Sequence, residues 1–554
     1  MLARLLVLLS ILLAPIGCHN RPAPRPAVAE SRPQLFNGMG PHRRTVTTVS
    51  PLAQKYFDQG LNFAYAFNHD EAIRSFKEAA RLDPDCAMAW WGVALCHGPH
   101  INNAAMTPEA SAAAWAALER ARKAAPKVSG LERELIDALG ARYADPAPED
   151  RAPLDAAYAA AMKGLWEKYP RDADIGCLYA EAMMDLRPWD LWTQDGSPQP
   201  GTEEIVATLE RVLELNPMHP GANHLYIHAV EASPAPERAV ASATRLRTLV
   251  PASGHMVHMP SHIDIRVGEW QKASEANRKA ILADERYREL SPGQGFYRVY
   301  MAHNHHFLSF SCMMQGRRRD SLRAARELLA SIPKDFKRQS PELVDPFLPI
   351  LGDVQMRFGM WKDILKLPEP GTQFPIARAM RLFMRGVALA ALGRIDEARA
   401  EQALFAAAVE AVPEQAVISI NPARMVLSIA AHMLEGEIAL AEGKLDEAVS
   451  ALERGVAVED ELRYMEPPDW LHPVRHPLGA VLLRAGRYDE AEAVYREDLR
   501  RWPENGWSLF GLAEALRAQG NSEEAEAVDR RFKATWRWAD TEINASCLCV
   551  KPRG

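Results

Sequence analysis

Histidines are concentrated in one part of this chain. Eight of the 17 histidines in 554 residues lie in one window: His224, His228, His255, His258, His262, His303, His305 and His306. An even spread would place roughly two or three histidines there. Neutral imidazole nitrogens are ligands for zinc, copper and iron, so histidines that meet in space could bind a transition metal. Whether they meet depends on the elements that carry them.

The spacing of these histidines is helical. His224 and His228 are four residues apart, as are His258 and His262, while His255 precedes His258 by three. Residues separated by three or four positions share one face of an α-helix. The pattern therefore predicts helices that each present an imidazole-rich face.

Internal repeats in the C-terminal half indicate how such helices are arranged. The segments LGRIDEA, EGKLDEA, AGRYDEA and QGNSEEA begin at Leu392, Glu442, Ala485 and Gln519. Each contains a glycine, two spacers, an acid, a glutamate and an alanine. Glycine allows the turn that ends one helix, and the small alanine lets two paired helices approach closely. The pattern predicts helix-turn-helix units, in agreement with a composition of only 8% aromatic residues.

These units resemble the tetratricopeptide repeat (TPR) family. The stretch YFDQGLNFAYAFNHDEAIRSFKEAARLDP matches the signature residues of that family at Gly60, Ala64, Ala72, Phe76, Ala79 and Pro84. Phe67 stands where the turn glycine is expected. The resemblance covers most of residues 50 to 535. It implies an all-α fold, a TPR-type α-solenoid that winds as a right-handed superhelix, with the first helix of each pair lining the concave groove.

The repeats supply a register for the histidines. Histidines lie ten and thirteen residues before two turn glycines: His258 and His255 before Gly268, and His306 and His303 before Gly316. The closing prolines place His224 and His228 one repeat earlier in the same register. In the TPR family such positions face the groove, whereas His305 falls at a core position. The register predicts that the groove-facing histidines converge.

Carboxylates extend the predicted groove site. Glu231 follows His228 by three residues, and alignment of GCLYAEAMMD with NHLYIHAVEA places Glu181 level with His228, with Asp185 four residues later. We predict a transition-metal site for copper, zinc or iron. Its candidate ligands are His224, His228, Glu231, His255, His258, His262, His303, His306, Glu181 and Asp185. Glu231 and Glu181 are the candidate general bases if the metal supports chemistry on a small molecule.

Two other interpretations of the histidines remain open. They could form a structural network with carboxylates and with carbonyl groups freed near Pro260. Alternatively, the groove could bind a peptide or protein without metal, as a scaffold of the cell envelope. Two insertions, from Asp185 to Gly201 with Trp189 and from His97 to Asn103, could cover the groove as lids or pack as ordinary loops.

The N-terminal sequence predicts export. An apolar run from Leu5 to Leu13 precedes Gly17 and Cys18, which is typical of a signal peptide with a lipobox. We expect lipidation at Cys18 and a periplasmic protein anchored to the outer membrane, touching the membrane only through its lipid. Exported bacterial TPR lipoproteins with a His-Met-Pro-Ser-His-Ile segment resemble this chain, which carries HMPSHI from His258. The net charge of -7 disfavours nucleic-acid binding.

The sequence predicts six segments. They are a signal peptide (1–18), a proline-rich tether (19–49), N-terminal TPR-like repeats with insertions (50–170), His-rich repeats that form the groove site (171–333), C-terminal TPR repeats (334–535) and a tail (536–554). In the tail, Cys547 and Cys549 could bind a metal, pair with a partner or remain surface thiols. His472 and His476 form a further histidine pair outside the predicted groove site.

Overall fold

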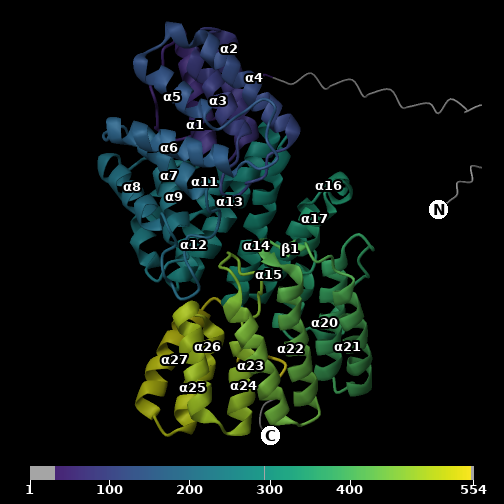
Figure 1. Ribbon diagram of the computed structural model, residues 1–554. Coiled ribbons are helices and arrows are strands. Elements are labelled where there is room, and N and C mark those ends of the chain that lie inside the picture. The colour runs from purple at the N-terminus through teal and green to yellow at the C-terminus, as the bar shows by residue number, and fades with distance from the viewer. Residues whose placement is uncertain (1–31, 292, 551–554) are drawn as a thin grey trace, which may run out of the picture.

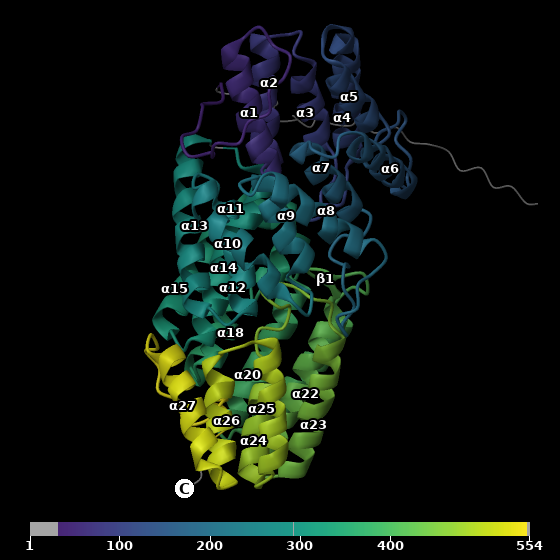
Figure 2. The ribbon, with the colours of Figure 1, turned by 90° about the vertical axis from the view of Figure 1, so that its left-hand side faces the viewer.

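The computed structural model describes residues 32–291 and 293–550 as an elongated stack of helices (Figure 1). The N-terminal helices form one end and the C-terminal repeats the other, and a view turned by 90° shows the same order (Figure 2). In the described part, the only named strands are β1 (Val417–Ile418) and β2 (Asn421–Pro422), a short antiparallel pair. The predicted all-α, TPR-type solenoid is confirmed. No helix of the described residues is long and apolar enough to cross a membrane.

The N-terminal end consists of helical hairpins. Its helices are α1 (Pro51–Tyr65), α2 (His69–Leu82), α3 (Ala87–His97), α4 (Pro108–Ala124), η1 (Ala125–Lys127), α5 (Gly130–Gly140) and α6 (Ala152–Lys168). The Phe76 ring packs against Gly60 of α1 and Gly92 of α3, where an added Cβ would lie 2.7 Å from ring atoms. The small residues of the repeat therefore create the space into which the large one packs.

The middle of the stack carries the histidines. Its helices are α7 (Ala173–Met184), α8 (Thr202–Leu215), α9 (Pro220–Val230), η2 (Pro236–Ala239), α10 (Val240–Leu249), α11 (Gly254–His258), α12 (Pro260–Arg266), α13 (Trp270–Leu290), η3 (Gly295–Tyr297), α14 (Arg298–Met314) and α15 (Arg318–Ser331). Pro260 divides one histidine-bearing helix into α11 and α12, since proline has no N–H to continue the helical bonding and is accepted at a first helical position.

Short helices connect the middle to four regular C-terminal hairpins. The connecting elements are α16 (Lys334–Gln339), α17 (Pro341–Val344), η4 (Asp345–Phe347), α18 (Ile350–Arg357) and α19 (Trp361–Ile364). The hairpin helices are α20 (Pro375–Ala391), α21 (Ile395–Glu410), α22 (Ala423–Ala441), α23 (Leu445–Glu461), α24 (Arg475–Ala485), α25 (Tyr488–Arg501), α26 (Gly506–Ala518) and α27 (Ser522–Trp536). Their predicted turn glycines, Gly393, Gly443, Gly486 and Gly520, have φ between 76° and 84°. Glycine adopts this left-handed conformation without steric cost.

The C-terminal hairpins contact the middle of the stack directly. Trp270 Nε1 donates to the Pro503 carbonyl at 2.8 Å, and Trp507 Nε1 donates to the Met313 carbonyl at 2.9 Å. The solenoid thus folds back on itself. As a result, the loop of residues 462–474 between α23 and α24 reaches the histidine-bearing helices.

Both ends of the chain differ from the expected free segments. Residues 1–31, with the predicted signal peptide and Cys18, lie outside the described residues. From residue 32 the predicted tether has no helix, but it packs on the body: Met39 and Val46 are buried, and Arg44 binds Asp172. In the tail Cys547 and Cys549 form a disulfide with each other, and Cys549 is buried. The expectation of surface thiols is therefore wrong.

Candidate metal centre

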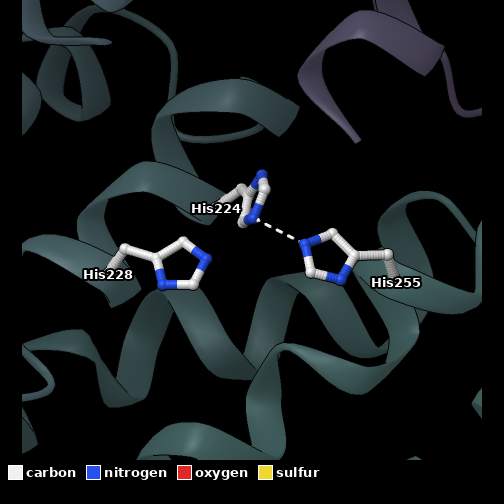
Figure 3. A group of neighbouring side chains, drawn as sticks. All are labelled: His224, His228 and His255. Atoms are coloured by element: carbon white, nitrogen blue, oxygen red, sulfur yellow. Dashed lines mark hydrogen bonds between the residues drawn. The ribbon is translucent and has the colours of Figure 1, made fainter. Parts of the chain in front are cut away.

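Six predicted histidines converge from α9, α11, α12 and α14. They form two groups, and within each group one ring nitrogen of every histidine lies within 4.8 Å of the others. The first group is His224, His228 and His255, whose rings point toward a common centre (Figure 3), and the second is His258, His262 and His303. We call these six residues together with Glu231 the histidine cluster.

Glu231 joins the two groups. Its Oε1 atom lies 2.8 Å from His228 Nδ1 and its Oε2 atom lies 2.5 Å from His262 Nδ1. The side chain is buried, which alone would raise the pKa of Glu231, but the neighbouring His262 and His228 outweigh burial and lower it. A carboxylate accepts hydrogen bonds, so both Nδ1 atoms carry the hydrogen, and whenever these rings are neutral their Nε2 atoms carry the lone pairs.

Two further histidines have the same tautomer for independent reasons. His224 Nδ1 lies 2.7 Å from the Tyr65 carbonyl oxygen, which can only accept. His258 Nδ1 lies 2.7 Å from Asn277 Oδ1, and the amide orientation is fixed because Asn277 Nδ2 donates to the Ala273 carbonyl at 2.9 Å. Four of the six imidazoles therefore donate through Nδ1 to groups around them, and each presents a lone pair at Nε2 when its ring is neutral.

The Nε2 atoms of His258 and His262 face one another. His258 Nε2 and His262 Nε2 are 2.8 Å apart, a distance at which two lone pairs repel unless a proton or a metal cation lies between them. Burial, followed by the neighbouring His303 and His262, holds the pKa of His258 well below its usual range, so protonation is disfavoured. His228 Nε2 and His255 Nδ1 are buried without any hydrogen-bond partner among the described residues. The cluster therefore contains buried imidazole nitrogens to which no described residue bonds.

Phe67 lies among these rings although the sequence pattern calls for a glycine there. It has a left-handed backbone with φ of 54°, is buried, and its ring centroid lies 4.4 Å from that of His100 and 4.5 Å from that of His224. A non-glycine residue with positive φ is uncommon and is associated with functional sites. The missing turn glycine was the available signal for this residue. His100, from the first insertion, had no comparable signal.

Glu466 is a second residue beside the histidine cluster that the sequence did not reveal. It lies in the loop between α23 and α24, with Oε2 3.3 Å from His262 Nδ1. Both carboxyl oxygens are buried and without a hydrogen-bond partner among the described residues. Burial, together with the charge of Glu231, raises the pKa of Glu466 well above its usual range. A neutral carboxyl group thus stands beside the histidine cluster.

Two acids and two histidines of the same region lie outside the histidine cluster. Asp185 forms an ion pair with Arg142 of the loop after α5, and the buried Glu181 also experiences the charge of that arginine. The sequence-based alignment could not include this arginine, so both acids are misplaced in the predicted ligand set. His306 packs its ring against Phe347, 5.5 Å away, and is in neither group of ligand atoms. His305 lies beside Glu327 of α15.

The two insertions meet at the histidine cluster. Trp189 Nε1 donates to Asn102 Oδ1 at 3.1 Å, and the Trp189 ring approaches the His228 ring edge-on with centroids 5.2 Å apart. Arg463, on the loop that carries Glu466, donates to the Trp189 carbonyl at 3.2 Å. The two insertions therefore contact each other beside the histidine cluster, which both the lid and the ordinary-loop interpretation allow.

A second histidine cluster lies beneath α1 and differs in its bonding. His42 Nε2 and His219 Nε2 lie 2.9 Å and 3.1 Å from Asp174 Oδ1, Tyr65 donates to the same oxygen at 2.6 Å, and Arg44 donates to Oδ2 at 3.0 Å. His219 Nδ1 accepts the backbone N–H of residue 222. We call His42, His219, Asp174, Tyr65 and Arg44 the closed cluster, because each of these hydrogen bonds joins a donor to an acceptor.

His472 and His476 belong to neither cluster. His476 lies between Asp498, 3.0 Å from its Nε2, and Arg357, 3.0 Å from its Nδ1. His472 lies 3.4 Å from Asp353. These contacts place the pair in a separate buried network.

Comparisons with known proteins identify the repeats. Family models described as tetratricopeptide repeat match residues 57–129 and 477–536, and a second such model matches residues 379–401. The chain therefore contains tetratricopeptide repeats, as its sequence predicts. No curated protein is significantly similar to it in sequence.

Several solved structures resemble the chain at low identity. Yeast Tom70 is 13% identical over 87% of this chain and 90% of its own, with a TM-score of 0.30. The Cut9–Hcn1 assembly of the APC/C is 14% identical over 87% and 76%, with a TM-score of 0.31. The human IFIT1 dimer is 13% identical over 88% and 91%, with a TM-score of 0.30.

Proposed function

We propose that this tetratricopeptide repeat protein binds transition-metal ions in its histidine cluster. The observation that carries the proposal is the pair of facing nitrogens, His258 Nε2 and His262 Nε2, 2.8 Å apart in a buried site. The Nδ1 atoms of both rings bond to acceptors, so two neutral rings direct both Nε2 lone pairs into the space between them. A metal ion bound to these atoms would remove the repulsion between the lone pairs, as a shared proton also would.

The donor set favours zinc, copper or iron. Each group offers three imidazole nitrogens, and the nearby oxygens are too few for magnesium or calcium. Four imidazoles bond through Nδ1 to a carboxylate, an amide oxygen or a backbone carbonyl, which is how proteins orient metal-binding histidines. Three protein ligands would leave a coordination position open at either group.

Chemistry on a small molecule belongs to the same proposal. A metal held by three imidazoles can activate water or dioxygen at its open position. Glu231, one of the predicted bases, hydrogen-bonds two imidazoles and so orients them. Glu181 is in neither group of ligand atoms and experiences the charge of Arg142, which leaves Glu466 as the better-placed carboxyl group for proton transfer at the cluster.

The metal proposal is tested by elemental analysis. The chain from His19 onward, made without a polyhistidine tag, is loaded with zinc, copper or iron in turn and exchanged into metal-free buffer. We expect about one or two ions per chain, and loss of at least one in His258→Ala/His262→Ala. The matched control, His42→Ala/His219→Ala, removes two histidines from the closed cluster and should retain the metal. Absence of every metal from the unaltered protein would overturn the proposal.

We also propose that the protein acts in the periplasm as an outer-membrane lipoprotein. Support comes from the apolar run Leu5 to Leu13 and from Gly17–Cys18. Growth with labelled palmitate should label the protein, whereas Cys18→Ser should abolish the label and release the protein into the soluble periplasmic fraction. Label on the Cys18→Ser variant would contradict this assignment.

A scaffold function has one observation in its favour. A cavity of about 450 Å³, which Trp189 lines, carries five arginines, of which Arg187 and Arg501 pair with the acids Asp190 and Asp460 in the same lining; the other three are Arg266, Arg463 and Arg500. Arginine recognises carboxylates through paired hydrogen bonds. If the chain binds no metal, capture of a peptide by a carboxylate at this cavity becomes the better proposal. Titration with an acidic peptide against its amidated form would then test it.

A further inference from the structure

We propose that a second, mainly apolar cavity beside the histidine cluster binds an uncharged, largely apolar small molecule whose single polar group meets Glu466 and His303. This inference rests on the proposed metal function, because it names the class of molecule on which that site would act. It extends that function from metal binding to recognition of an organic ligand.

The cavity has the size of a small-molecule site. Its volume is about 450 Å³, within the usual range of roughly 300–1,000 Å³ for ligand pockets. Its walls come from α14, α18, α20, the β1–β2 segment and the loop between α23 and α24. Apolar side chains dominate them, including Val299, Phe347, Ile350, Ile376, Met380 and Trp470. Such walls favour aliphatic or aromatic surface.

The charged groups in the walls argue against a charged ligand. No lysine or arginine is among the described residues that line the cavity, so a fixed anion would have no protein counter-ion. Burial raises the pKa of Asp353 to about 8 and of Asp469 to about 7. Near pH 7 Asp353 is therefore mostly neutral and Asp469 about half ionised, and Glu342 in the lining is exposed to solvent, so a cation would meet little buried negative charge.

The inner end of the cavity is the histidine cluster itself. His228, His255, His262 and His303 all line it, as does Glu466. The carboxyl group of Glu466 is a buried polar group in the cavity wall: Oε2 lies 3.3 Å from His262 Nδ1, which already bonds to Glu231, and neither oxygen has a hydrogen bond among the described residues. A buried polar group without a partner costs free energy, which a ligand hydroxyl or carbonyl would recover. The cavity thus joins an apolar body to a polar end.

The neutral aromatic dye N-phenyl-1-naphthylamine is the reporter for the test, since its fluorescence rises in apolar surroundings. We expect saturable binding of about one dye per chain. Three naphthalene compounds that differ only in charge then compete with it: naphthalenemethanol, naphthoate and naphthylmethylammonium. The neutral alcohol should displace the dye at concentrations at least tenfold lower than either ion. Equal displacement by a charged compound would overturn the inference.

Variants locate the dye in this cavity. Val299→Trp fills the cavity from a partly exposed position and should weaken binding at least tenfold, whereas Val240→Trp adds the same bulk at an exposed position of α10. Ile418→Trp, from β1, is the second blocking variant if Val299→Trp loses its helical circular dichroism. Unchanged dye binding in a folded blocking variant would contradict the assignment.

The same samples separate this inference from the metal proposal. Elemental analysis of each sample reports metal independently of the dye. Dye binding in a protein that takes up no metal would overturn only the metal proposal. Metal uptake without specific dye binding would overturn only the cavity proposal.

Discussion

The histidine cluster and the closed cluster contain the same residue types and differ in hydrogen bonding. In the closed cluster, His42, His219, Tyr65 and Arg44 all donate to the one carboxylate of Asp174. In the histidine cluster Glu231 accepts from two imidazoles, whereas the Nε2 atoms of His258 and His262 lie 2.8 Å apart with no carboxylate between them. Convergence of histidines and acids is therefore insufficient evidence for a metal site. The two clusters are distinguished by which of their nitrogen and oxygen atoms have hydrogen-bond partners.

The closed cluster has a structural role that its position explains. His42 and Arg44 belong to the segment before α1, whereas Asp174 begins α7 and His219 precedes α9. Burial would raise the pKa of Asp174, but the hydrogen bonds from His219 and His42 outweigh it and hold the pKa well below the usual range. The ionised carboxylate ties the N-terminal segment to the repeats.

Asp174→Ala is expected to have the largest effect on stability. It leaves the His42 and His219 imidazoles without their shared acceptor, although Arg44 keeps Asp172, and loss of one partner of a buried ion pair costs about 3–5 kcal/mol. Chemical denaturation followed by circular dichroism measures the change. Metal content should stay as in the unaltered protein, and loss of metal with unchanged stability would reverse the roles assigned to the two clusters.

Glu231→Gln should produce the opposite pattern. The amide cannot accept from both imidazoles in the same way, so His228 and His262 lose their fixed tautomers. Loss of such a hydrogen-bonding partner typically lowers metal affinity about ten- to a hundredfold. Competition with a chelator measures the affinity, and the exposed Glu237→Gln is the control. Equal affinity in Glu231→Gln and Glu237→Gln would show that Glu231 does not orient metal ligands.

The pH dependence of stability tests the closed cluster further. Burial lowers the pKa of His219 below 6.5, and Asp174 only partly opposes the shift. The unfolded chain then binds a proton near pH 6.5 that the folded chain does not, so stability falls as pH decreases from 7 to 5. Each unit by which folding lowers the pKa of His219 corresponds to about 1 kcal/mol of this loss of stability, and His219→Gln should remove that contribution. Thermal unfolding at both pH values checks this, and an unchanged pH dependence in the variant would contradict it.

The sequence could predict what depends on the repeat register. The positions of six histidines and Glu231 follow from helical spacing and from the turn glycines at Gly268 and Gly316. The contact between Asp185 and Arg142 could not be predicted, because Arg142 lies in an irregular loop outside that register. Glu466 was invisible for another reason: the solenoid folds back, and a loop more than 200 positions from His262 reaches the site.

Phe67 shows a limit of the repeat signature itself. The missing turn glycine was visible in the sequence, yet only the structure shows that the left-handed turn is kept. The turn is retained with a phenylalanine whose ring packs on His100 and His224. Departures from a repeat pattern are thus places to look for function.

The smallest expected effects distinguish the covering role of Trp189 from ordinary packing. Trp189→Phe keeps an aromatic ring beside His228 but removes the hydrogen bond to Asn102, whereas Trp192→Phe removes a hydrogen bond to the backbone carbonyl of Ala229 in the same insertion. Each loss should cost about 1 kcal/mol of stability.

Of the two tryptophans, only Trp189 bonds to the other insertion. Trp189→Phe, and not Trp192→Phe, should therefore let the two insertions separate more often. We expect metal transfer to a chelator to accelerate about two- to fivefold in Trp189→Phe, which corresponds to roughly 0.4–1 kcal/mol, and to remain unchanged in Trp192→Phe. Stopped-flow absorbance with a chromogenic chelator measures both rates. Equal acceleration in both variants would mean that the insertion acts through its general stability, whereas no acceleration in either would mean that metal leaves by a route that avoids Trp189.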